Sequence, residues 1–140
     1  MPDWMLFALG SAVCAALTAI LAKIGVQGVP AALATFIRTA VVLGVTALAV
    51  CLRREWAQTG RLDSRAWTFL ALSGIATALS WLCYFRALQS GPASIVAPID
   101  KLSLPLAIVL AVAVLGERLT AGQWLGAGLM TAGALLVALG

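Results

Sequence analysis

The chain has 140 residues, of which 63% are hydrophobic and only 10% are charged, and its formal net charge is +4. Its mean hydropathy is +1.07. A water-soluble domain carries about 25% charged residues, so the composition argues against a soluble globular protein. The positive charge is small and scattered, which argues against a nucleic-acid partner. The composition therefore predicts an integral membrane protein whose surroundings are the lipid bilayer.

Five apolar runs are long enough to cross a bilayer, which takes roughly 20 residues per helix. They cover residues 4–26, 33–52, 67–88, 95–115 and 121–139, and the short segments between them are rich in turn-forming or polar residues. The first run lacks a basic flank and is too long for a signal peptide, so it counts as a span. The predicted fold is an all-α membrane protein in which residues 1–140 form a single five-helix domain.

Basic residues lie in alternate connections. The second and fourth connections contain Arg53, Arg54, Arg61, Arg65 and Arg118, whereas the first and third contain no Lys or Arg. The positive-inside rule places the basic connections in the cytoplasm. We therefore expect a cytoplasmic N-terminus and an external C-terminus.

The sequence offers no catalytic or metal-binding pattern. It has no histidine, and Cys14, Cys51 and Cys83 form no CxxC pair and lie in or beside apolar runs. It also lacks GxSxG and HExxH motifs and a pair of carboxylates at membrane depth. We expect no metal, no cofactor and no enzymatic activity.

Five ionisable residues lie within or at the ends of the apolar runs, namely Lys23, Arg38, Arg86, Asp100 and Lys101. A charge at the centre of a spanning helix costs roughly 2.5–3.5 kcal/mol on insertion scales. The predicted topology brings all five to the outer side of the membrane. Lys23 and Arg86 either snorkel to the headgroups or take part in a salt bridge or in coupling. Arg38 and Asp100 lie deeper, where a structural salt bridge competes with a substrate or coupling-ion site as the explanation.

Asp100 is the carboxylate that a proton-coupled mechanism would use, since no other lies within an apolar run. Adjacent residues on a regular helix point about 100° apart, so we expect Arg38 rather than Lys101 to pair with it. Pro98 and Pro105 bracket this position and predict a kinked or broken helix. Non-helical backbone at membrane depth persists only beside protein or a water-filled cavity, and broken helices of this kind line transporter sites.

Two further patterns carry alternatives. Trp81 and Tyr84 belong to an aromatic face of the third run that either packs the bundle or contacts the apolar part of a ligand. Gly122 and Gly126 form a GxxxG motif in the last run, which allows two helix backbones to approach closely. That motif serves either packing within the chain or a dimer interface.

The stretch from Pro98 to Ser103, the Leu-Gly-Glu-Arg-Leu sequence at 115–119 and the Gln123-Trp-Leu-Gly126 sequence, followed by Gly133, resemble the EamA domain of the drug/metabolite transporter superfamily. The early Ala-Lys at 22–23 and Ile-Arg-Thr at 37–39 fit the same pattern. The resemblance covers essentially the full chain. It implies the short, single-repeat bacterial or archaeal type, located in the cytoplasmic (inner) membrane and completed by a homodimer or by a paired five-helix relative. It also places Glu117 in a cytoplasmic turn, where it would cap the last helix.

The leading hypothesis is a secondary transporter that moves small organic metabolites, anionic or zwitterionic and amino-acid-like, by alternating access. Arg38 and Lys101 would hold the anionic group, Asp100 would pair with them or carry a proton, and Trp81 with Tyr84 would contact the apolar part. The alternative is a lipid-carrier flippase or an accessory membrane subunit without transport activity of its own. Substrate, coupling ion, direction of transport and the parallel or antiparallel arrangement of a dimer stay open at this point.

Overall fold

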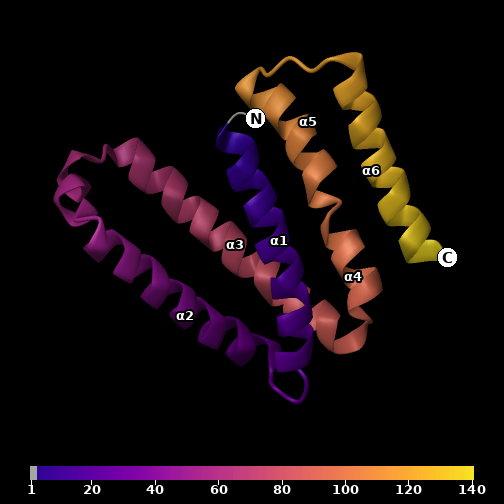
Figure 1. The fold of residues 1–140 in the computed structure, drawn as a ribbon, viewed down its shortest axis with the longest axis horizontal. Helices are drawn as coiled ribbons and strands as arrows, with labels where there is room; N and C mark the ends of the chain where they lie inside the picture. Colours follow the sequence, from indigo (N-terminus) through magenta and orange to yellow (C-terminus); the bar gives the residue numbers. More distant parts are fainter. Residues whose placement is uncertain (1–2) are drawn as a thin grey trace. The chain divides into compact units, whose positions relative to one another are not determined.

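The computed structural model describes residues 3–140, and all regular structure in that range is helical. The elements are α1 (Asp3–Gly25), α2 (Ala31–Leu52), the 3-10 helix η1 (Glu55–Arg61), α3 (Ser64–Ser90), α4 (Ala93–Asp100), α5 (Ser103–Leu115) and α6 (Ala121–Leu139) (Figure 1). Taking Ala93–Leu115 as one span, five segments of the described chain are long and apolar enough to cross a membrane. The predicted class, an all-α membrane protein with five spanning helices, is confirmed.

The chain forms two compact units, which we describe separately. Unit 1 comprises residues 1–20 together with 90–140, and unit 2 comprises residues 21–89. In unit 1, α6 packs against both α4 and α5 (Figure 1). In unit 2, α2 and α3 are joined through η1, which packs on α2. Side-chain contacts connect the beginning of α2 with α3: Gln89 donates to the Val29 carbonyl, and Arg38 lies on the Trp81 ring.

Most large apolar side chains in the described chain are exposed, with values such as 80% for Phe7 and 66% for Leu125. The fully or nearly buried apolar residues are few: Val26, Tyr84, Phe85 and Leu88 in unit 2, and Ala127 and Ala134 in unit 1. In water this much exposed apolar surface would be strongly unfavourable. In a bilayer the acyl chains solvate it, so the exposure agrees with the membrane assignment.

Local sequence defines the start of α6 and the end of α5. Thr120 Oγ1 accepts a hydrogen bond from the Gln123 backbone N–H, and the Gln123 side chain accepts one from the Thr120 N–H at 2.8 Å. This capping box satisfies backbone donors that a helix start leaves unpaired. The expectation that Glu117 caps this helix is wrong, because Thr120 occupies the N-cap. Gly116 ends α5 with a φ of +70°, a conformation that glycine adopts without steric cost.

The fourth span is interrupted at Lys101 and Leu102, between its two prolines. Pro105 has no N–H, so the Lys101 carbonyl cannot receive the usual bond from four residues ahead. That carbonyl instead accepts from the Leu104 N–H at 2.9 Å, while the Lys101 N–H is shared between the Pro98 carbonyl at 3.1 Å and the Ala97 carbonyl at 3.2 Å. Bonds three residues apart tighten the chain into a turn, which separates α4 from α5.

Candidate functional site

Arg38 lies on the face of Trp81 in unit 2. Its guanidinium carbon is 3.3 Å from the centre of the Trp81 ring, well inside the distance of about 6 Å over which a cation is attracted to an aromatic face. Arg38 and Trp81 are both partly exposed. The contact connects α2 to α3 at a level where each helix is within its apolar span.

The ring of Trp81 also contacts two aromatic neighbours on the same face of α3. Tyr84 meets it edge-on, with ring centres 5.4 Å apart and planes at 82°, and Phe85 lies 5.6 Å away at 47°. Residues three and four apart share a helix face, so the spacing of these rings along α3 brings them into contact. Tyr84 and Phe85 are 9% and 3% exposed. We call Arg38, Trp81, Tyr84 and Phe85 the aromatic–arginine cluster.

Stacking leaves the hydrogen-bonding capacity of Arg38 largely unused. A guanidinium donates through N–H groups that lie in its own plane, whereas the contact with Trp81 uses its flat face. Within residues 21–89, no acidic side chain or carbonyl accepts a hydrogen bond from Arg38. The nearby Thr35 and Thr39 hydroxyls donate to carbonyls of their own helix at 2.8 Å. The cluster therefore presents an oriented cation beside an apolar aromatic wall, a combination suited to an organic anion.

Asp100 and Lys101 lie at the interruption of the fourth span in unit 1. Lys101 Nζ is 3.0 Å from Asp100 Oδ2, which makes a hydrogen-bonded ion pair. The regular-helix argument disfavoured this partner. The Lys101 side chain is nevertheless long enough to reach back to the adjacent carboxylate at the end of α4. Arg38 and Asp100 belong to different units, and their pairing stays a prediction.

Lys23 and Arg86 lie at the helix ends of unit 2. Lys23 Nζ donates to the Leu88 carbonyl at 2.6 Å, and Arg86 donates to the side chain of Gln89 at 3.3 Å. The Gln89 amide in turn donates to the Val29 carbonyl at 2.6 Å. Sequence reasoning singled out both cations but not Gln89. The sequence did offer one indication for Gln89, because it is a polar amide at the end of a spanning helix and next to a turn.

Gly122 and Gly126 contribute little to packing inside their unit. A methyl group built on Gly126 would meet no atom within 4 Å, and one on Gly122 would meet only the Thr120 hydroxyl at 3.9 Å. The buried small residues of α6 are instead Ala127 and Ala134, one face further round the helix. Among the described residues, no group of three or more His, Cys, Asp or Glu side chains could hold a metal ion.

Five apolar spans with ionisable groups inside them define a multi-pass membrane protein. The sequence profile of the EamA-like transporter family matches residues 3–139. The chain is also 48% identical over 136 residues to a Sinorhizobium sp. protein described as "Uncharacterized transporter in cobO 3'region", covering 97% of this chain and 96% of the relative. No solved structure matches the chain significantly. The chain therefore belongs to the EamA-like transporter family, within the drug/metabolite transporter superfamily, and this membership indicates a membrane transporter rather than an enzyme.

Proposed function

We propose that this protein is a secondary transporter that moves small organic anions or zwitterions, such as amino-acid-like metabolites, across the cytoplasmic membrane by alternating access. The observation that carries the proposal is the stacking of Arg38 on Trp81 within two spanning helices. A membrane-embedded cation is costly and is retained where it serves a polar pathway. Family membership supports transport, and the chemistry of the aromatic–arginine cluster supports the proposed substrate class.

The chemistry of the aromatic–arginine cluster favours an anionic group joined to an apolar part. The in-plane donors of Arg38 match a carboxylate or phosphate bidentately. Trp81, which is partly exposed, offers an aromatic surface for the apolar part, and the buried Tyr84 supports its ring edge-on. An anion bound to Arg38 would also neutralise a charge that has no acidic partner within unit 2.

Asp100 and Lys101 form a second, electrically balanced group at the break in the fourth span. Half-helix ends at membrane depth are where transporters hold substrate groups and coupling ions. We assign Asp100 the coupling proton and Lys101 a role in holding the anionic group. Because the two are 3.0 Å apart, protonation of Asp100 would release Lys101 for substrate, which couples the two events.

We propose that the working carrier is a homodimer or a pair with a five-helix relative. Most large apolar side chains of the described residues are exposed, and the EamA-like family profile spans residues 3–139. The Gly122 and Gly126 face of α6 is open within unit 1, so it is available for close helix contact.

The test is counterflow in proteoliposomes loaded with a panel of amino acids and organic anions. The purified wild-type protein should exchange at least one anionic or zwitterionic solute. Arg38→Gln should abolish exchange while circular dichroism remains unchanged, and Arg118→Gln, which removes the same charge from a connecting segment, should exchange normally. Normal exchange by Arg38→Gln would refute the assigned role. If wild-type protein exchanges no solute alone but supports transport by a co-reconstituted partner, the accessory-subunit alternative holds.

A further inference from the structure

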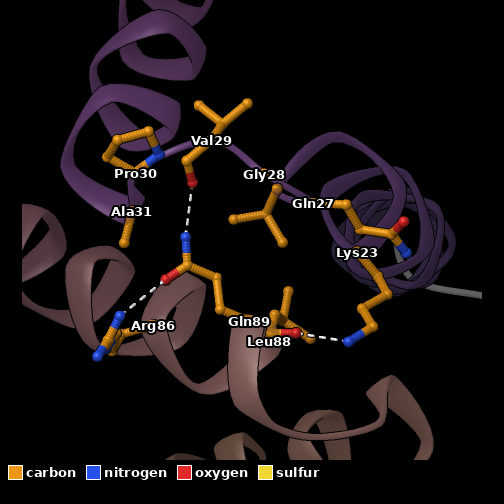
Figure 2. Close-up of a pocket in the computed structure, with 10 residues that line it drawn as sticks. Lys23, Gln27, Gly28, Val29, Pro30, Ala31, Arg86, Leu88 and Gln89 are labelled. Atoms are coloured by element: carbon orange, nitrogen blue, oxygen red, sulfur yellow. Dashed lines mark hydrogen bonds between the residues drawn. The ribbon is translucent and has the colours of Figure 1, made fainter.

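A cavity of about 540 Å³ lies in unit 2, where α1 ends and α2 begins, against the end of α3 (Figure 2). Its wall includes the side chains of Lys23, Gln27, Arg86 and Gln89 and the turn at Gly28. The cavity does not include the aromatic–arginine cluster. The cavity is therefore separate from the aromatic–arginine cluster, although both lie in unit 2.

The lining is cationic. Two of the described lining residues, Lys23 and Arg86, are basic, two are amides, and none is acidic. Figure 2 shows Lys23 and Arg86 on either side of the segment that carries Leu88 and Gln89. Two positive charges on one wall without a compensating carboxylate there make the cavity attractive to an anion.

Hydrogen bonds hold this wall in a defined shape. Gln89 links the α1–α2 connection to the end of α3, through its 2.6 Å bond to the Val29 carbonyl, and it also accepts from Arg86 (Figure 2). Lys23 is fixed to α3 by its bond to the Leu88 carbonyl. Preorganised donors lower the entropic cost of capturing a ligand.

We propose that this cavity binds the anionic phosphate group of a membrane phospholipid, or of a soluble phosphate compound with the same chemistry. Lys and Arg are the side chains that recognise phosphate, Lys as a point charge and Arg through its planar fork. The cavity lies at the ends of spanning helices, which is the depth of lipid headgroups. Basic pockets between spanning helices on the cytoplasmic side of membranes bind phospholipid headgroups in this way, and the phosphate chemistry is the same at the opposite end of the helices. This inference is independent of the transported substrate.

The experiment measures binding of two probes, dihexanoyl phosphatidylglycerol and inorganic phosphate, to the purified full-length protein in an uncharged detergent by titration calorimetry and native mass spectrometry. Wild type should bind saturably. Arg86→Gln should weaken binding about tenfold, as expected when one charge-assisted hydrogen bond is lost, and Arg86→Lys should retain an intermediate affinity. Arg118→Gln is the matched control and should bind like wild type. Circular dichroism checks that each variant folds.

The two probes separate the possible sources of the anion. Saturable phosphatidylglycerol binding that inorganic phosphate competes away supports a lipid headgroup held through its phosphate, and binding of inorganic phosphate alone supports a soluble phosphate compound. Dihexanoyl phosphatidylcholine should bind more weakly than phosphatidylglycerol, because its choline offsets the phosphate charge. The proposal fails if neither probe saturates, or if Arg86→Gln and Arg118→Gln lose the same affinity, since that result would indicate only a general attraction to positive charge.

Discussion

The contact between Arg38 and Trp81 makes the sharpest prediction about this molecule. Helix α2 has 22 residues, so it is about 33 Å long, close to the roughly 30 Å thickness of the hydrocarbon core. Arg38 lies seven positions after its first residue, Ala31, which is about 10 Å along the axis. We therefore expect the Arg38 Cα to lie inside the hydrocarbon. A desolvated cation–π contact contributes about 2 kcal/mol, compared with about 0.5–1 kcal/mol at an exposed site.

A double-mutant cycle with Arg38→Gln, Trp81→Leu and the double variant measures this contribution. Unfolding in dodecyl maltoside with rising mole fractions of sodium dodecyl sulfate, followed by circular dichroism, gives the free energy of unfolding of each variant. We expect a coupling energy of about 2 kcal/mol. The matched control is Arg65 and Phe69, an exposed pair at 5.8 Å, for which we expect at most about 0.5 kcal/mol. A coupling energy for Arg38 and Trp81 no larger than that of the control would refute the reasoning.

Four further outcomes follow from local structure. Thr120→Ala removes the capping box of α6 and should lower the free energy of unfolding by about 1 kcal/mol in the same detergent titration. Gly116→Ala forces a left-handed residue and should cost about 1–2 kcal/mol, whereas Gly128→Ala, whose added methyl meets no atom, should be neutral or stabilising; equal effects of the two would contradict this. Gly126→Ile should leave the unfolding of a single chain unchanged but abolish dimer crosslinking, and persistence of the dimer would exclude that face of α6. Asp100→Asn should preserve circular dichroism and abolish proton-driven uptake while counterflow continues; unchanged proton-driven uptake would remove Asp100 from coupling.

The orientation predicted from the basic connections is open to direct measurement. In a background without cysteine, single cysteines at Gly60, in the second connection, and at Gly140 should react with impermeant maleimide from opposite sides of the membrane. Labelling of each position from both sides would instead indicate dual insertion, which an antiparallel homodimer requires.

Hydropathy alone was sufficient for the class of fold, because the requirement to satisfy every backbone polar group in hydrocarbon leaves an apolar helix as the outcome for each run. The same argument extended to the interruption in the fourth span, since the missing N–H of Pro105 is a covalent property of the residue. The residue that caps α6 was harder to predict from the sequence. A glutamate three residues before the cap and a Thr-x-x-Gln box both fit a helix start, and the hydrogen bonds of Thr120 with Gln123 decided between them.

Side-chain partners depended on tertiary structure. The charge and depth of Arg38 indicated a functional or paired residue, but its contact with Trp81 joins side chains of two helices that are brought near each other only by folding. Likewise, the sequence argument did not predict that Asp100 pairs with its neighbour Lys101, whose long side chain reaches the carboxylate at the end of α4. Linear order defines which residues enter the membrane, since insertion responds to the summed hydropathy of a continuous segment. Which polar groups meet is set by packing between segments far apart in sequence, and no local periodicity encodes it.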